Sequence, residues 1–351
     1  MIPVKNVYYM LSYAFRILQE KGYASIKIEE FNNTAELFAA ILCKGVSNQL
    51  KRGLRREYIL TTESLSMPRG KIEISESLTE ISRMQQRLVC THDEFSENAY
   101  MNRILKTVML RLLRFDVKAE RKKELRKILD YFDDVEPLDI HTINWRFQYN
   151  RNNQSYRMLM GICYLAVKGL LQTQESGSSK MMDFLDDQKM HRLYERFILE
   201  YYRTEFKGVL RAESSEVKWV LDDDFDELLP GMQSDIMLTA GDRTLIIDAK
   251  YYTHSLISKY EKESVRSAHL YQIFTYVKNK EAALADIPHQ KVAGMLLYAQ
   301  TEEEGSFDKT YHMSGNPITI KTLDLNSDFG EIRRDLDEIA KRFLGVERMI
   351  A

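Results

Sequence analysis

Two short apolar segments in the last third of the chain are bordered by charged residues, and this pattern constrains the fold more than any other feature. Residues 236–238 follow Asp235, and residues 245–247 precede Asp248 and Lys250. The Ala-Gly-Asp sequence between the two segments is typical of a tight turn, so a β-hairpin is predicted here. Residues two apart in a strand point to the same face, which places Asp248 and Lys250 together and brings Asp235 alongside them.

The charged residues at the end of this apolar strand predict a cation site. A buried carboxylate without a partner is strongly unfavourable, and a divalent cation would provide a partner for both aspartates. Asp235 and Asp248, with the backbone carbonyl of Ala249 and water, would form the oxygen-rich site that Mg2+ prefers, and Mn2+ is also compatible. Lys250 would orient the attacking water or help to deprotonate it, which predicts phosphodiester hydrolysis. An isolated Asp-x-Lys is more often a surface ion pair, and the complete hairpin pattern favours the cation site instead.

The first half of the chain is predicted to be mainly helical. With 351 residues, of which 44% are apolar and 29% charged, the chain is long enough for two folded domains. β-Prone residues and a Pro-Arg-Gly turn within residues 58–74 predict short strands or a projecting hairpin. Residues 173–180, rich in Gln, Glu, Ser and Gly, predict a linker. Apolar residues recur at helical spacing in residues 4–18, 38–46, 98–115, 118–132 and 155–171.

The second half is predicted to alternate between strands and helices, which is typical of an α/β fold. Helices are expected near residues 190–206 and 265–279, and strands near residues 217–221, 234–238, 244–251, 292–299 and 318–323. The predicted layout is therefore an α/β (α+β) domain over residues 181–351, preceded over residues 1–175 by a mainly helical domain with a short β-hairpin region.

Charge and composition narrow the class of protein. A formal net charge of -2 provides no global attraction to nucleic acid, so any such contact would be local, and the basic run at residues 118–127 is more often a solvated helix face. The three cysteines form no CxxC pair, which fits a reducing cytoplasm. The start has no signal-peptide pattern, and the longest apolar stretch, residues 158–171, is shorter than the roughly 20 residues that a membrane helix needs. A cytoplasmic protein without membrane contact is expected.

The hairpin pattern resembles the PD-(D/E)xK nuclease core, with Ser234 at the position of the nominal proline. Gln272 and Tyr276 resemble the Gln-x-x-x-Tyr motif that follows this core in RecB-like branches. The chain as a whole is similar to the McrC family, the nuclease subunits of McrBC modification-dependent restriction systems. The segments that carry this likeness are Ile2-Pro-Val-Lys-Asn-Val-Tyr-Tyr-Met-Leu-Ser-Tyr, Gly70-Lys-Ile-Glu, Asn102-Arg-Ile-Leu-Lys and Ile247-Asp-Ala-Lys-Tyr-Tyr.

The resemblance implies a role for each residue of the site. Asp235 and Asp248 would be the metal ligands and Lys250 the catalytic lysine. The first helix of such cores often supplies a glutamate, for which Glu195 and Glu200 are both candidates. Gln272 and Tyr276, one helical turn apart, would brace the site or the DNA backbone, although helix packing explains Tyr276 nearly as well. The seven histidines show no HxH or HExxH spacing and are assigned no role.

The resemblance also implies a partner. The sequence has no G-x-x-x-x-G-K-[ST] motif, so no nucleotide is expected to bind this chain through a P-loop. A separate McrB-type AAA+ GTPase hexamer would bind the N-terminal domain, supply the energy and have its GTP hydrolysis stimulated, while this subunit cuts double-stranded DNA carrying 5-methylcytosine in a bacterial or archaeal cytoplasm. Two alternatives stay open: a RecB-like nuclease of another DNA-processing system, and a catalytically dead adaptor that regulates a partner AAA+ NTPase.

Overall fold

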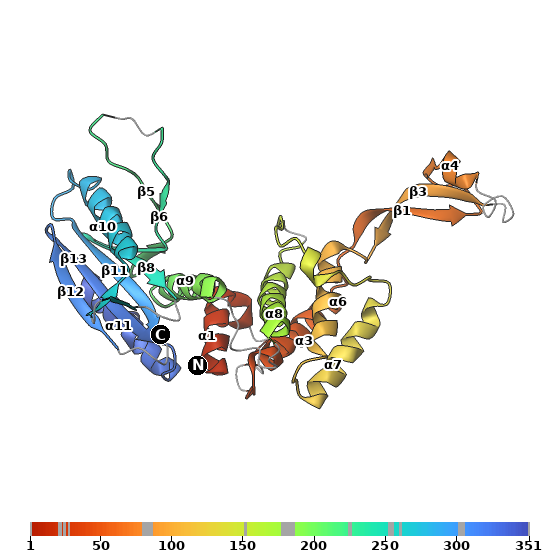
Figure 1. Cartoon of the computed structure of the whole chain (residues 1–351), viewed down its shortest axis with the longest axis horizontal. Coiled ribbons are helices and arrows are strands. Elements are labelled where there is room, and N and C mark those ends of the chain that lie inside the picture. The colour runs from red at the N-terminus through yellow and green to blue at the C-terminus, as the bar shows by residue number, and fades with distance from the viewer. Residues whose placement is uncertain are drawn as a thin grey trace. The chain divides into compact units, whose positions relative to one another are not determined.

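The chain forms two compact units (Figure 1). The computed structural model describes residues 2–19, 23, 26, 29–78, 87–150, 153–176, 187–223, 227–251, 256–259, 262–300 and 306–349. The first unit combines Met1–Asn32 with Met182–Ala351, and the second is Asn33–Met181. The first 32 residues were expected in the N-terminal domain, and the structure places them with the C-terminal part of the chain instead.

Packing explains the different position of the N-terminal segment. Helix α1 (Val4–Ala14) contacts α9 (Asp187–Glu205), and the Tyr9 ring stacks on Phe329 at 4.1 Å between centroids. The buried Asn6 amide donates to the carbonyl of Leu325 at 2.7 Å. These contacts join residues more than 300 positions apart, so helical periodicity could not predict them.

The first unit is built on a mixed six-stranded sheet, which confirms the expected mixed α/β character. Its strands are ordered β12, β13, β11, β8, β7, β4. The strand β8 (Arg243–Lys250) lies between β7 (Ile236–Ala240), which is antiparallel to it, and β11 (Lys291–Gln300), which is parallel. The remaining elements of this unit are η1 (Arg16–Gln19), β4 (Arg211–Glu213), β5 (Glu216–Val217), β6 (Met232–Gln233), β9 (Leu256–Lys259), β10 (Lys262–Val265), α10 (Ser267–Ala282), β12 (Asp308–Met313), β13 (Asn316–Asp324) and α11 (Phe329–Leu344).

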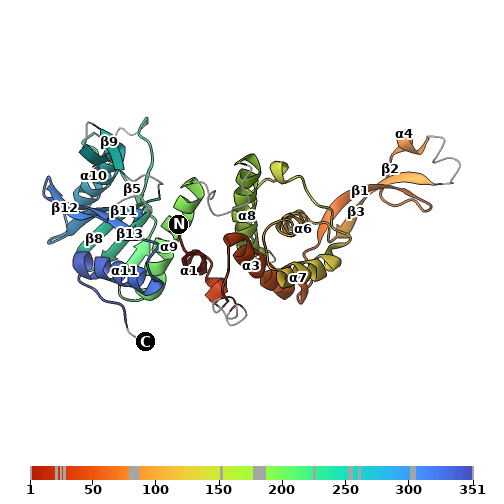
Figure 2. The same ribbon diagram turned by 60° about the horizontal axis from the view of Figure 1, so that its bottom comes forward.

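Helices cover both faces of this sheet (Figure 2). On one face, α10 packs Ile273 and Val277 into a cluster with apolar residues of β7, β8, β11 and β13. The other face is contacted by α9 and α11. Helix α11 was not predicted, although its buried residues recur at helical spacing, Asp328 caps its start and Gly345, with φ 71°, ends it. Because both faces are covered, seven of the eight residues of β8 are buried.

The second unit is a helical bundle from which a hairpin extends (Figure 1). Its helices α3, α6, α7 and α8 contact one another and bury apolar side chains such as Phe38 and Ile104. Helix α8 continues to Ser176, so the predicted linker at residues 173–180 begins inside a helix, and its last four residues lie outside the described part of the chain. The elements of this unit are α3 (Thr34–Leu50), β1 (Glu57–Leu65), β2 (Lys71–Ile72), α4 (Ile74–Ser77), β3 (Leu88–Ser96), α6 (Tyr100–Leu112), α7 (Ala119–Leu129), η3 (Asp130–Phe132), η4 (Ile140–Thr142) and α8 (Tyr156–Ser176).

The hairpin consists of β1 and β3, paired antiparallel over nine residues each, with β2 on the other side of β3. A projecting hairpin was expected within residues 58–74, and the structure shows that its second long strand is β3, which was not predicted. Gly70 has φ 69°, and a Cβ there would lie 2.4 Å from the carbonyl oxygen of Thr91, so this position requires glycine. At the hairpin base, the buried Asn102 donates to the carbonyls of Arg55 and Glu97, both at 2.8 Å.

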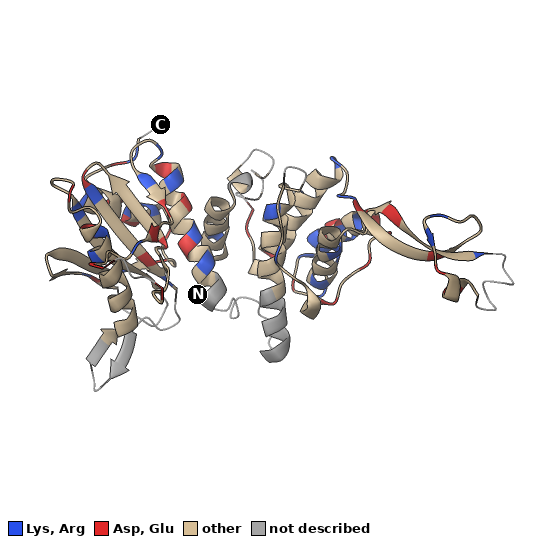
Figure 3. Ribbon diagram, turned by 90° about the horizontal axis from the view of Figure 1, so that it is seen from above, with Lys and Arg blue, Asp and Glu red and all other residues tan. Residues whose placement is uncertain are grey.

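Basic and acidic residues are interspersed along the helices of both units (Figure 3), which agrees with the small net charge. Within the described ranges, no helix combines the length and the apolar composition that a membrane span requires.

Candidate active site

The centre of the site is the end of β8. Asp248 and Lys250 are 1% and 7% exposed, and Nζ of Lys250 lies 2.8 Å from Oδ1 of Asp248. The other carboxylate oxygen, Oδ2, is buried and accepts no hydrogen bond from the residues that the structure describes. Burial raises the pKa of Asp248, the nearby Asp235 raises it further, and Lys250 lowers it. The aspartate is thus held where its ionised form lacks full compensation.

Asp235 joins Asp248 through the pairing of β7 with β8. Ile236 pairs with Ile247, so Asp235, one residue earlier, lies beside Asp248. The backbone N–H of Ala249 donates to Oδ2 of Asp235 at 3.0 Å and fixes its carboxylate at the end of the hairpin. The structure therefore brings together the three side chains that the sequence pattern selected.

The helix α9 supplies a third carboxylate from the far side of the site. Burial raises the pKa of Glu195 to about 7, with a further increase from Asp235 and a decrease from Lys250, which shows that Glu195 faces both. Its Oε1 lies 3.1 Å from Nδ1 of His191, one turn earlier. Glu200 instead pairs with Arg203 at 2.8 Å. Of the two glutamates considered from the sequence, only Glu195 is electrostatically coupled to the aspartates and lysine.

The helix α10 connects Lys250 to the strand that leads into Asp235. Nζ of Lys250 donates to Oε1 of Gln272 at 3.4 Å, and Nε2 of Gln272 donates to the Tyr276 hydroxyl at 3.0 Å. This hydroxyl donates in turn to the backbone carbonyl of Gln233 at 3.2 Å. Tyr276 is thus a hydrogen-bonding member of the site as well as part of the packing of α10.

Two histidines of the site were missed by the sequence reasoning. His191 contacts Glu195, and His269 forms a hydrogen bond of 2.8 Å with the hydroxyl of Tyr298. Burial lowers the pKa of both rings, and the charge of Lys250 lowers each further. His191 could have been found from its spacing of four from Glu195 on a predicted helix. No local signal links His269 to Tyr298.

The donor set fits one divalent cation only in part through protein carboxylates. Asp235 and Asp248 converge, and the uncompensated Oδ2 of Asp248 is suited to a hard cation. Among the described residues, no group of three or more His, Cys, Asp or Glu side chains is arranged to hold a metal ion. A cation here would therefore rest on two carboxylates, the carbonyl of Ala249 and water or substrate oxygens, which is the usual manner of Mg2+ binding.

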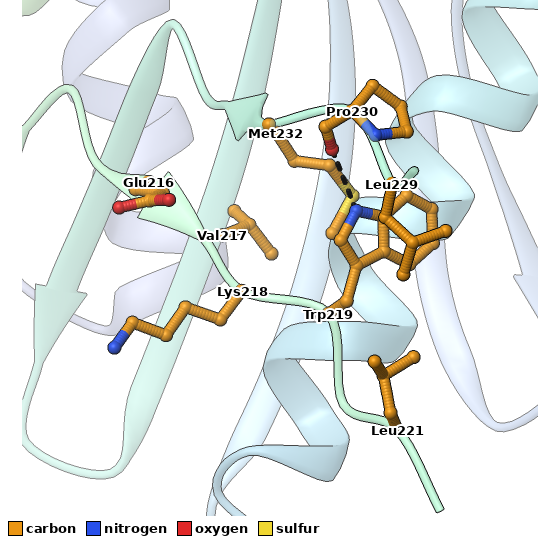
Figure 4. A pocket seen from close by; sticks show the side chains of 9 residues that line it. Glu216, Val217, Lys218, Trp219, Leu221, Leu229, Pro230 and Met232 are labelled. Atoms are coloured by element: carbon orange, nitrogen blue, oxygen red, sulfur yellow. Dashed lines mark hydrogen bonds between the residues drawn. The ribbon is translucent and has the colours of Figure 1, made fainter. Parts of the chain in front are cut away.

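A hollow of about 350 Å3 lies near the site, between the ends of β5 and β6 (Figure 4). Trp219, Leu229 and Pro230 form its apolar side, and the indole Nε1 of Trp219 donates to the carbonyl of Pro230 at 2.8 Å. Three residues separate Met232 at its floor from Asp235. None of the candidate catalytic residues lines this hollow.

Comparisons with known proteins agree with the resemblance seen in the sequence. One relative, described as "Type IV methyl-directed restriction enzyme EcoKMcrBC" of Escherichia coli (strain K12), is 27% identical over 351 residues, which are 98% of this chain and 98% of the relative. A solved assembly of Thermococcus gammatolerans McrB AAA+ hexamers with bound McrC contains a chain that is 19% identical, with a TM-score of 0.48, covering 96% of this chain and 76% of that one. The Thermococcus gammatolerans McrBC complex gives 22% identity and a TM-score of 0.39, covering 58% of each chain.

Both TM-scores are below 0.5, so the family assignment rests on sequence. The family described as "McrBC 5-methylcytosine restriction system component" matches residues 4–299, which is most of the chain. The chain therefore belongs to the McrBC family of restriction system components.

Proposed function

We propose that this chain is the DNA-cutting subunit of a modification-dependent restriction complex, with a PD-(D/E)xK core and a site formed by Asp235, Asp248 and Lys250. The observation that carries the proposal is the convergence of two carboxylates and an ammonium group at the end of one buried hairpin. A sheet buries such charges at a net cost unless they perform a function or bind an ion.

Each residue of the site has a separate task in this proposal. Asp235 and Asp248 would hold Mg2+ or Mn2+, and the cation would polarise the phosphate and favour ionisation of the attacking water. Lys250, oriented by Asp248 on one side and Gln272 on the other, would point its ammonium group at the phosphate or the water. Glu195, whose pKa is about 7, is suited to exchange a proton near neutral pH.

A partner motor follows from what the sequence lacks. The chain has no P-loop motif, and restriction driven by nucleotide hydrolysis needs a chain that has one. We therefore propose an AAA+ GTPase of the McrB type as the partner, whose GTP hydrolysis this chain stimulates. The projecting β1/β3 hairpin, with Tyr58, Leu60 and Phe95 exposed by 74%, 72% and 55%, is the surface proposed to contact it.

The test is cleavage of methylated double-stranded DNA with the partner, GTP and Mg2+ present. Asp248→Ala and Lys250→Ala are each expected to lower the rate by at least about 100-fold, because each removes a group acting on the reacting atoms. Asp242→Asn is the matched control, since Asp242 is exposed at the turn of the same hairpin. Undiminished cutting by the Lys250 variant would remove the catalytic assignment.

A second measurement separates a live site from a dead adaptor. Isothermal titration of the unmodified chain with Mn2+ in the presence of uncleavable DNA is expected to show one binding event that Asp235→Ala abolishes. If the unmodified protein binds no cation under these conditions, the adaptor alternative gains support.

A further inference from the structure

The buried pair of His269 and Tyr298 is not explained by the fold or by the proposed chemistry. His269 lies on α10, one turn before Gln272, and its ring is 8% exposed. Nδ1 of its ring and the hydroxyl of the fully buried Tyr298 share a hydrogen bond of 2.8 Å. Two polar groups have thus been buried together beside the sheet, where apolar residues would pack at lower cost.

The position of this pair is set by Lys250. Lys250 on β8 and Tyr298 on β11 are direct partners in the parallel ladder, so their side chains lie side by side on the same face of the sheet. His269 and Gln272 are three residues apart and therefore share a face of α10. Helix α10 is consequently joined to β11 through His269 and to β8 through Gln272, at two points one helical turn apart.

A lysine needs such support because its long side chain has many rotamers. Ordering a lysine side chain costs up to about 2 kcal/mol, and only well-placed acceptors offset this cost. The distance of 3.4 Å between Nζ of Lys250 and Oε1 of Gln272 is long for a hydrogen bond, so a small displacement of α10 would break it. The orientation of the ammonium group therefore depends on how firmly the first turn of α10 is attached to the sheet.

We propose that His269 and Tyr298 form a clamp that fixes the first turn of α10, so that Gln272 holds the ammonium group of Lys250 in its working position. Both are positioning residues, since they act on the reacting atoms only through Gln272 and Lys250. Burial, together with the charge of Lys250, lowers the pKa of His269 to about 4, so the ring stays neutral near neutral pH and adds no second positive charge beside the ammonium group. This inference rests on the proposed nuclease function.

The experiment is a double-mutant cycle on DNA cleavage by the full chain with its partner. His269→Ala and Tyr298→Phe are each expected to lower kcat about tenfold with little change in KM, because the lysine acts mainly in the transition state. The double variant is expected to lose no more than either single variant, since both substitutions break the same clamp.

Tyr202→Phe is the matched control for loss of a buried hydroxyl. The Tyr202 hydroxyl donates to the carbonyl of Leu336 at 2.8 Å, is equally buried and belongs to the same unit. It is expected to keep full activity at a temperature well below the Tm of every variant. Additive losses in the double variant, an unchanged kcat in the single variants, or an equal loss in Tyr202→Phe would each overturn the clamp. A wild-type chain that cuts no better than Lys250→Ala would instead overturn the proposed function.

Discussion

The β7/β8 hairpin and the β1/β3 hairpin share one topology but distribute polarity in opposite ways. In β8, Asp248 and Lys250 are buried, whereas in β1 the apolar Tyr58 and Leu60 are exposed. Charged groups in a core and large apolar side chains in water both lower stability, so neither arrangement is explained by folding alone. The comparison indicates that each hairpin carries a function, one toward a cation and a phosphate, the other toward an apolar protein surface.

Removing the cation of the buried pair is expected to give the largest change in stability. Lys250→Met leaves the carboxylate of Asp248 buried without its partner, so the free energy of unfolding should fall by about 3–5 kcal/mol at pH 8. At pH 5 the loss should be smaller, because the raised pKa of Asp248 allows the carboxyl to be protonated and neutral. Urea denaturation at both pH values measures this. Lys291→Met, exposed on β11, is the control, and an equal loss in both variants would show that the ion pair has no special role.

Truncating one leucine in each hairpin separates packing from exposure. Leu245→Ala in β8 removes a fully buried side chain and should cost about 2–5 kcal/mol. Leu60→Ala in β1 removes one that is 72% exposed and should change stability by no more than about 0.5 kcal/mol. The same Leu60 variant should weaken stimulation of the partner GTPase, measured as phosphate release. A strongly destabilised Leu60 variant would mean that the hairpin packs against part of its own chain.

Adding a divalent cation tests the buried hairpin without any cleavage assay. Mg2+ or Mn2+ at about ten times its Kd should stabilise the native chain by about 1.4 kcal/mol, seen as a rise of Tm in thermal unfolding. Asp235→Asn and Asp248→Asn should abolish this rise, while Asp242→Asn at the turn of the same hairpin should keep it. If both site variants respond like the native chain, the cation binds elsewhere.

The local parts of both hairpins could be predicted from sequence, and the long-range parts could not. Alternation and an Ala-Gly-Asp turn predicted the register that joins Asp235 to Asp248, because both residues lie within one hairpin. The partner strand of β1 begins 23 residues after β1 ends, and no turn motif marks the pairing. His269 meets Tyr298, and α1 meets α9, only through the tertiary fold. Spacing within one element thus identified the ligands and the lysine, but not the groups that hold them from other elements.

The smallest expected effect concerns Glu195 and sharpens the account of the buried hairpin. Because burial and Asp235 raise its folded-state pKa from 4.5 to about 7, its contribution to stability is full below pH 4.5 and is lost as the pH rises through about 7. The Tm of the native chain without divalent cation should therefore fall over this range. Glu195→Gln should fall less steeply, since the amide does not ionise. The control is Glu200→Gln on the same helix, whose native carboxylate pairs with Arg203. Equal slopes for the native chain and Glu195→Gln would mean that Glu195 is not coupled to the aspartates.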